Sequence, residues 1–393
     1  MFFYIDRIES ELKRILCFWQ NNVLSGNSIF REVSTDGSAN TEAPVGNVFL
    51  SGIIYGASVL TRFLNVDSPL NLAQLAYNEQ QLSLANPNGG YYFGRSSDSK
   101  IIHEGYDIGY TQAYVLLGLI EYFKTTNSNT ALNEITQLID FIEVTFTDDQ
   151  YGGYLEGFDV NWNRYSETKK SLATHLRIME AYASYYQISA DKKILTRLEE
   201  IIDLLISKFF NDRDLNLQLE FSQNWQFSSK KNNMGLTAET SWLIYKCAKI
   251  TKNTSLIELS AQVAVQLAGY LIEFAFDNHY GGVFSKLTEY QTPENTSKEW
   301  WVQTEATLAF LNSFEITDDK VYLNYAARLF EYIDCVFSDE ENGEWHDSIT
   351  REGLPIASIP KIHFSKSMHH IIRYCIESHK RFKHLAQTMS ITK

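Results

Sequence analysis

The hydrophobic and polar positions of this chain recur with the period of an α-helix along most of its length. In the segment 130–146, for example, Ile135, Leu138, Ile139 and Ile142 follow the spacing i, i+3, i+4, i+7, which places them on one face of a helix. Similar amphipathic segments cover residues 4–21, 191–210, 255–276 and 321–337. Each has an apolar face and a polar face, so we expect these helices to form an outer layer.

A second kind of helical segment is apolar nearly all round and richer in small and aromatic residues. Six such segments begin at Val48, Asp107, Leu172, Gly235, Glu299 and His363. Their starts are 59, 65, 63, 64 and 64 residues apart. Helices of this composition are typical of an inner layer that an outer layer covers.

A glycine turn recurs with the same period. The stretch YGGYLEGFD begins at Tyr151 and YGGVFSKLT begins at Tyr280, and weaker versions begin at Asn88 and Asn342. The first glycines of the four copies are 63, 129 and 62 residues apart, so one copy is missing near position 217. We interpret this motif as the turn after each outer helix, where glycine supplies a positive φ and the aromatic residue begins a short strand.

Together these patterns predict an all-α fold. We expect a single domain over residues 1–393, made of six repeats of about 64 residues. Stacked helical pairs could form an open solenoid, but six complete pairs favour an (α/α)6 barrel of six inner and six outer helices. Short β-hairpin-like turns would lie at its mouth. The inner helices would run parallel, with their N-termini and free amide donors at that mouth.

Composition and charge narrow the class of partner. The net charge of −14 argues against nucleic acid or an anionic membrane as the main partner. The longest uncharged stretch, 43–61, contains a proline and three glycines, so we expect no membrane span. The four cysteines are scattered, which favours a reducing cytoplasm over disulfides or a zinc site. We therefore expect a cytoplasmic protein with a small-molecule substrate, no cofactor and no metal. The sequence leaves the oligomeric state open, with a homodimer as one alternative.

The residues that open the inner helices are the candidate site. By topology alone they converge on the mouth: Tyr110, Gln112, His175, Arg177, Glu239, Trp242, Trp300, Trp301, Gln303, Glu305, His363 and Lys366. Histidine can act as a base near neutral pH, and a carboxylate can orient it or carry a proton. Glu239 and Glu305 stand out because a carboxylate inside an apolar helix is costly unless it is paired or used. His369 and His370, deeper in the last helix, are expected to pack in the core.

At these residues the sequence resembles the N-acylglucosamine 2-epimerase superfamily, which includes cellobiose 2-epimerases and mannose isomerases. The stretch EWWVQTEATLAFL from Glu299 is similar to that family's WWxQxEAxxA helix, and THLRIMEAY from Thr174 is similar to NTHLHxLEAY. YTQAYVLLGL, ETSWLI and the YGGYLEGFD turn also match family motifs, in order along essentially the whole chain. The resemblance implies an (α/α)6 barrel and proton transfer at C2 of a sugar, beside the carbonyl.

The chain departs from the family pattern at several catalytic positions. The family's first inner helix carries an arginine, whereas VGNVFLSGIIYG has none. The GHDxE motif reads GLTAE, so Leu236 stands where the family has a catalytic histidine and only Glu239 remains. In the last motif, PYHxxR, the histidine is kept as His363 and the arginine becomes Lys366. Arg177 replaces the second histidine of NTHLHxLEAY.

These departures set three hypotheses side by side. The first is a diverged isomerase or 2-epimerase that acts on a sugar or another small polar molecule, with His363 as base. Glu239, Glu305 and His175 would be further acid–base groups, Arg177 or Lys366 would stabilise the oxyanion, and Tyr110, Gln112, Trp242, Trp301 and Gln303 would bind substrate. The second is a non-catalytic ligand-binding or regulatory protein that kept the cleft. The third is a barrel repurposed for different chemistry in a specialised biosynthetic pathway.

Overall fold

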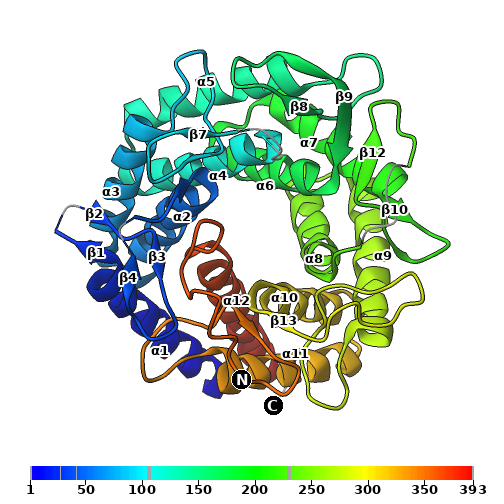
Figure 1. The fold of residues 1–393 in the computed structure, drawn as a ribbon. Helices are drawn as coiled ribbons and strands as arrows, with labels where there is room; N and C mark the ends of the chain where they lie inside the picture. The colour runs from blue at the N-terminus through cyan, green and yellow to red at the C-terminus, as the bar shows by residue number, and fades with distance from the viewer. Residues whose placement is uncertain (1, 27, 41, 104–107, 228–231, 392–393) are drawn as a thin grey trace.

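The computed structural model describes residues 2–26, 28–40, 42–103, 108–227 and 232–391, and it shows two concentric rings of helices (Figure 1). The inner helices are α2 (Asn47–Leu64), α4 (Ile108–Thr126), α6 (Leu172–Ser189), α8 (Met234–Thr251), α10 (Trp300–Thr317) and α12 (His369–Ile391). The outer helices are α1 (Phe2–Phe18), α3 (Ser68–Ser83), α5 (Asn129–Phe146), α7 (Lys192–Leu204), α9 (Thr254–Tyr270) and α11 (Lys320–Tyr332). The predicted all-α (α/α)6 barrel is confirmed; the helix start expected at Asp107 lies outside the described residues.

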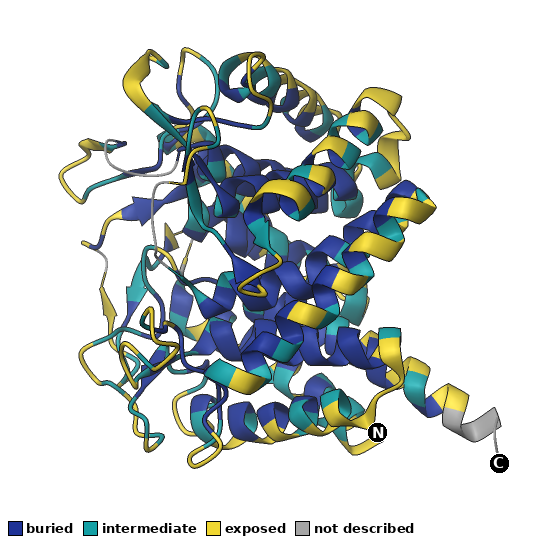
Figure 2. Ribbon diagram, turned by 90° about the vertical axis from the view of Figure 1, so that its right-hand side faces the viewer, coloured by how far each residue is buried: buried dark blue, intermediate teal, exposed yellow. Residues whose placement is uncertain are grey.

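The two rings differ in burial as their sequences predict. In α10 every residue from Val302 to Phe314 is buried, and buried residues fill the interior of the molecule (Figure 2). In α7 only Ile194, Leu198, Ile201 and Ile202 are buried, one apolar stripe of an otherwise charged helix. The segments Asn47–Leu64 and Thr254–Ala275 are long and apolar enough to cross a membrane by composition, and both form part of the barrel wall.

The two ends of the barrel carry different connections. From inner to outer helix the loops are short, since a residue in the left-handed conformation ends the inner helix and an N-cap residue begins the next. These pairs are Ala190 and Asp191, Lys252 and Asn253, and Asp318 and Asp319. The cap side chains accept hydrogen bonds from the first amides of the outer helices. This end of the barrel is therefore compact.

From outer to inner helix the connections are long and carry the strands, which gather at the mouth (Figure 1). The sheets are β1 (Leu24–Ser25) with β2 (Ser28–Ile29), β3 (Glu32–Val33) with β4 (Ala39–Asn40), β5 (Val45–Gly46) with β6 (Gly94–Arg95) and β7 (Ile101–Ile102), β8 (Glu156–Phe158) with β9 (Arg164–Ser171) and β12 (Glu220–Ser222), β10 (Phe210–Asn211) with β11 (Asn216–Leu217), and β13 (Lys298–Glu299) with β14 (Ser348–Ile349). All pairs are antiparallel. The β10–β11 hairpin occupies the place of the missing glycine turn near position 217.

Four of the outer helices end in a π-helical turn just before these connections. The turns are Trp19–Val23, Leu205–Phe209, Leu271–Ala275 and Ile333–Phe337. Each adds a residue to the last turn of the helix, and an extended residue follows it. The wider turn thus directs the chain from the outer ring across the mouth.

The last inner helix begins later than the sequence predicts. Its expected start at His363 is wrong: α12 begins at His369, and residues 363–368 form turns. The apolar residue Phe364 continues the helical spacing, but its ring lies against Gly46 and Gly94, where a Cβ atom would stand 2.8 and 2.5 Å away. Phe364 therefore packs across the mouth and not along a helix. This shift places His369 and His370 at the first turn of α12.

The turn at Tyr151 offers a direct test of why glycine recurs there. Both Gly152 (φ +72°) and Gly153 (φ +79°) have left-handed backbone, but only at Gly153 would a Cβ atom meet neighbours, with His175 Nε2 at 2.7 Å. We expect Gly152→Ala to lose roughly 1–2 kcal/mol of unfolding free energy from backbone strain alone. Gly153→Ala should lose about 1–3 kcal/mol more, because its methyl group also overpacks the turn. Urea denaturation of both variants measures the difference, and equal losses would refute the packing argument.

Candidate active site

A polar side chain in the first turn of several inner helices holds the neighbouring glycine turn. Gln112 accepts a hydrogen bond from the Tyr91 amide (2.8 Å) and donates one to the Tyr91 carbonyl (2.7 Å). Gln303 makes the same pair of contacts with Val283 (2.7 and 2.8 Å). We call these side chains turn clamps, because they fix the backbone directly after each pair of glycines.

His175 in the first turn of α6 and Lys366 just before α12 act as turn clamps in two further repeats. In the last of these repeats Gly343 and Glu344 take the place of the glycine pair, both with positive φ. His175 Nε2 accepts from the Tyr154 amide at 3.0 Å, and its Nδ1 lies 2.7 Å from the Ser171 carbonyl. Lys366 Nζ donates to the Trp345 carbonyl at 2.5 Å. Burial lowers the pKa of His175 to about 4 and that of Lys366 to about 8.

This geometry corrects the roles that the sequence predicts for the four clamps. The side chains of Gln112, His175, Gln303 and Lys366 are buried and bonded to backbone atoms. A histidine with both ring nitrogens engaged in this way holds a turn, so we do not retain His175 as an acid–base group. The two glutamines and Lys366 are likewise not retained as substrate ligands or as an oxyanion donor.

The centre of the barrel holds a cluster of buried charges built around Arg373 of α12. Arg373 Nη1 donates to Glu180 at 2.8 Å. Its Nη2 donates to Glu305 at 2.8 Å and also contacts Glu239. These carboxylates come from α6, α10 and α8, so one guanidinium joins four inner helices. All four side chains are at most 9% exposed.

Arg177 completes this cluster from the other side. Its Nη2 donates to Glu239 at 2.8 Å and its Nη1 contacts Glu180. The guanidinium also lies 4.8 Å from the centre of the Tyr114 ring and 5.8 Å from that of Tyr110, within the range of a cation–π contact. Burial alone would raise the pKa of Glu239, but Arg177 and Arg373 outweigh it and lower that pKa. Glu239 and Arg177, both predicted site residues, are thus paired with each other.

A histidine and a carboxylate form a hydrogen-bonded pair at the mouth side of this cluster. His370 Nδ1 lies 2.7 Å from Glu305 Oε1, and Trp242 Nε1 donates to Glu305 Oε2 at 2.8 Å. Burial would raise the pKa of Glu305, but Arg373 and His370 lower it to about 2. We assign the ring proton to Nδ1, because the ionised carboxylate beside it can only accept, and this assignment leaves Nε2 as the basic nitrogen. His370 therefore has the form of an oriented general base.

The mouth side of this pair is aromatic. His370 is half-buried, and its ring centre lies 5.6 Å from Trp301 and 5.7 Å from Trp300. Trp301 donates from Nε1 to Glu299 at 2.7 Å. Its ring covers Gly235, where a Cβ atom would stand only 2.1 Å from it. The indole of Trp301 is held beside His370 and could stack against a sugar ring.

Glu239, Glu305 and His370 also satisfy the distance requirement of a metal site, since one ligand atom from each lies within 4.8 Å of the others. The space between them is filled by Arg373 Nη2, which contacts both carboxylates and lies 3.2 Å from His370 Nδ1. The cation that these residues hold is therefore a guanidinium, and they do not fit a metal ion as arranged.

His363 forms a second histidine–carboxylate pair in the loop before α12. Its Nε2 lies 3.0 Å from Asp347 Oδ2, and its side chain is 27% exposed. Burial would raise the pKa of Asp347, but its hydrogen bond to His363 and the charge of Lys366 lower it. Asp347 also accepts a hydrogen bond from Ser348. The pair is separate in sequence from the first, and it is more accessible.

The sequence did not identify three residues of the site: Glu180 and Arg373 of the central cluster, and His370 of the histidine–carboxylate pair. The signal for Glu180 was present, because it follows Arg177 at i+3 and is a carboxylate in an apolar helix, the argument already applied to Glu239. His370 and Arg373 were missed because the last helix was started six residues too early. With the start at His369, both residues fall in the first two turns of α12, at the same end of the barrel as the first turns of the other inner helices.

The fold and the site thus define an (α/α)6-barrel protein with histidine–carboxylate pairs at the mouth of the inner ring. Residues 30–373 match the family model described as N-acylglucosamine 2-epimerase (GlcNAc 2-epimerase), and the chain belongs to this family. The cellobiose 2-epimerase of Dictyoglomus turgidum is 27% identical over 94% of this chain and 96% of its own length. That of Bacteroides fragilis is 25% identical over 93% and 95%.

Solved structures agree on the fold. The cellobiose 2-epimerase from Bacillus thermoamylovorans superposes with a TM-score of 0.89 at 24% identity, covering 97% of this chain and all of that one. A D-mannose isomerase gives a TM-score of 0.86 at 18% identity, covering 95% and 97%. The family match confirms the resemblance that the sequence motifs indicated, and the solved structures confirm the fold.

The buried clamp His175 makes the protein sensitive to acid. Its pKa is lowered to about 4 in the folded chain, against about 6.5 when unfolded. The unfolded state therefore binds the proton more readily, and stability falls as the pH drops from 6.5 towards 4. We expect His175→Gln, which copies the clamps Gln112 and Gln303, to reduce the unfolding free energy lost on acidification by up to roughly 3 kcal/mol. Thermal denaturation at pH 7.5 and pH 4.5 checks this; an unchanged difference between the two pH values contradicts it.

Proposed function

We propose that this protein moves a proton at the carbon next to the carbonyl of a sugar, as a 2-epimerase or an aldose–ketose isomerase. The observation that carries the proposal is the His370–Glu305 pair, at 2.7 Å, beside Trp301 at the mouth of the barrel. The family membership also supports the proposal, as do relatives named cellobiose 2-epimerase that match almost the whole chain.

In the proposed reaction His370 Nε2 takes the proton from C2 of the open-chain sugar. The electron pair of the broken C–H bond forms the C1–C2 double bond of an enediolate, and the carbonyl oxygen takes up the negative charge. The central cluster has three carboxylates, Glu180, Glu239 and Glu305, but only two guanidiniums, Arg177 and Arg373. The imidazolium formed on His370 would therefore face a net negative charge, which stabilises it.

The direction from which the proton returns decides the product. Return of the proton to C1 by the same group gives the ketose, whereas delivery to the opposite face of C2 gives the epimer and requires a second group. Leu236 removes the histidine that the family resemblance would place there. His363, held by Asp347 at 3.0 Å, is the remaining histidine–carboxylate pair and the proposed second group. Its retention favours 2-epimerisation.

The first test is hydrogen exchange from solvent. The protein is incubated in D₂O with glucose, mannose, fructose, N-acetylglucosamine, N-acetylmannosamine and cellobiose, and C2–H and C1–H are followed by NMR. We expect deuterium at C2 of at least one sugar, and His370→Asn should lower the rate by about 10²–10⁴-fold. His279→Asn, at an exposed histidine of another turn, is the matched control and should exchange normally. Absence of exchange with every sugar would contradict the proposal and favour the non-catalytic alternative.

The roles of the two histidines are separated by product analysis. If His363 delivers the second proton, His363→Asn should keep deuterium exchange at C2 within about tenfold while losing formation of the epimer by 10²-fold or more, roughly the contribution of one acid–base group. The ratio of epimer to exchanged substrate is measured in the same NMR experiment. A variant that loses both to the same extent would show that His363 is the first base, and one that loses neither would show that it takes no part.

A further inference from the structure

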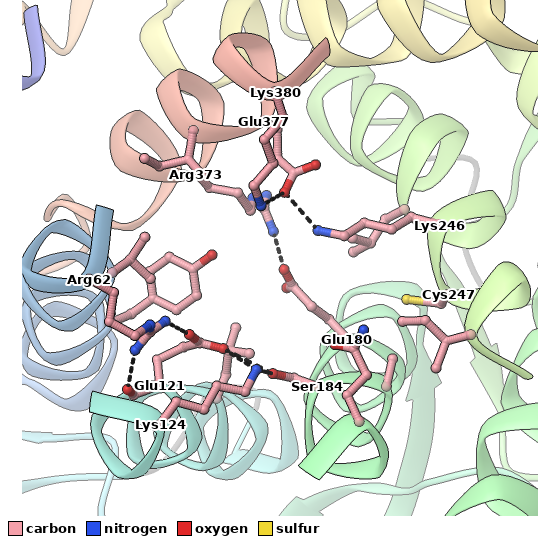
Figure 3. Close-up of a pocket in the computed structure, with 18 residues that line it drawn as sticks. Arg62, Glu121, Lys124, Glu180, Ser184, Lys246, Cys247, Arg373, Glu377 and Lys380 are labelled. Atoms are coloured by element: carbon pink, nitrogen blue, oxygen red, sulfur yellow. Dashed lines mark hydrogen bonds and ion pairs between the residues drawn. The ribbon is translucent and has the colours of Figure 1, made fainter. Parts of the chain in front are cut away.

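A cavity lies behind the central cluster, on the side of the barrel away from the mouth. Its volume is about 290 Å³, and its lining residues come from α2, α4, α6, α8 and α12. They belong to the middle and last turns of α2, α4, α6 and α8 and to the second to fourth turns of α12. The mouth residues belong to the first turns. Figure 3 shows the charged side chains that line the cavity, among them Arg62, Lys246 and Arg373, directed towards one space. The cavity is just below the roughly 300–1,000 Å³ typical of small-molecule sites.

The first charged wall has two cations for one carboxylate. Arg62 of α2 and Lys124 of α4 both bind Glu121, Lys124 at 2.8 Å. Lys124 also donates to Ser184 at 2.7 Å. Glu121 is only 9% exposed, and burial would raise its pKa, but the two cations lower it. This wall therefore carries one positive charge in excess.

The facing wall repeats this arrangement. Lys246 of α8 and Lys380 of α12 share Glu377, at 3.2 and 3.3 Å. Burial again opposes ionisation of Glu377, yet the neighbouring cations, Lys246 first among them, lower its pKa strongly. The second wall also carries one positive charge in excess. Both contacts to Glu377 are long for charge-assisted hydrogen bonds, so Lys246 and Lys380 keep donors for another acceptor.

The floor of the cavity is the central cluster itself. Arg373 and Glu180 line the cavity and are also members of that cluster. Arg373 is 1% exposed, and its Nε has no hydrogen-bond partner among the residues that the structure describes. A buried N–H without a partner is costly and indicates a missing acceptor.

We infer that this cavity binds a small phosphate-type anion: inorganic phosphate or a phosphate monoester. The two facing walls together carry two excess positive charges, which outweigh the single net negative charge of the central cluster at the floor, so the cavity favours an anion. A phosphate group offers several acceptor oxygens to cationic donors that converge from two sides. Its oxygens would accept from Lys246 and Lys380 on one wall and from Arg62 and Lys124 on the other. The inference does not depend on the proposed function, since it concerns binding alone.

A competing explanation is that the basic residues only neutralise the negative ends of the inner helices. Arg62 and Lys124 lie in the last turns of α2 and α4, where cations are favourable without any ligand. That explanation does not account for Lys246, which lies five residues before the end of α8, or for the buried Nε of Arg373, which has no partner among the described residues. It predicts that phosphate does not bind in a saturable way.

Isothermal titration with inorganic phosphate at low ionic strength separates the two explanations. We expect saturable binding of one phosphate per chain and a rise of the melting temperature with phosphate concentration. Lys246→Met should weaken binding by about tenfold, the effect of losing one charged contact. Lys249→Met is the matched control, because Lys249 is an exposed lysine of the same helix that does not line the cavity; its affinity should stay that of the wild type.

Lys380→Gln provides a second variant that does not endanger folding, because Lys380 is 63% exposed. It should also weaken phosphate binding. Titration with glucose 6-phosphate beside inorganic phosphate distinguishes the two sources of the anion: tighter binding of the ester indicates a phosphorylated metabolite, and equal binding indicates free phosphate. No saturable binding of either, or affinities that Lys246→Met and Lys380→Gln leave unchanged, would overturn the inference whether or not the protein acts on sugars.

Discussion

The structure depends on the burial of charge at its centre. Two guanidiniums and three carboxylates lie inside an (α/α)6 barrel at most 9% exposed, and removing one partner from such a cluster typically costs roughly 3–5 kcal/mol because the others remain buried and unpaired. Arg373 comes from the last inner helix and its carboxylates come from α6, α8 and α10. The cluster requires the register of α12 that places Arg373 against the carboxylates of α6, α8 and α10, a directional requirement that apolar packing does not impose. Closure of the ring is therefore specified by hydrogen bonds as well as by hydrophobic burial.

The turn clamps connect the helices that hold the central cluster to the loops at the mouth. Two of the clamps lie two residues before a member of the cluster on the same helix, as His175 precedes Arg177 and Gln303 precedes Glu305. A helix that is fixed by the cluster therefore also fixes the glycine turn that its clamp holds. The loops of the mouth are thus positioned by the same helices that position the buried charges. This is why a chain with long connections can still present a defined site.

Most of the fold could be predicted from the sequence, because helical periodicity and the positive φ of paired glycines are local properties. The site could be predicted only in part. Glu239 and Glu305 were identified since a carboxylate in an apolar helix needs a partner, but the partner, Arg373, depends on where α12 begins. Gln112 and Gln303 open inner helices as substrate ligands would, and nothing local reveals that a backbone amide from a distant turn meets them. The correct predictions rest on local sequence patterns. The missed contacts depend on how distant segments align with one another, which no single segment encodes.

Leu236, in the first turn of α8, cannot transfer a proton, so the proposed chemistry depends on α12. The carboxylate that follows on α8, Glu239, is bound by Arg177 and Arg373. The same Arg373 holds Glu305, which orients His370. Two histidines and an arginine thus lie within the first five residues of α12. Because Arg373 also lines the rear cavity, any anion bound there would act on the guanidinium that sets the charge around His370, and the two ends of the barrel would be linked through one side chain.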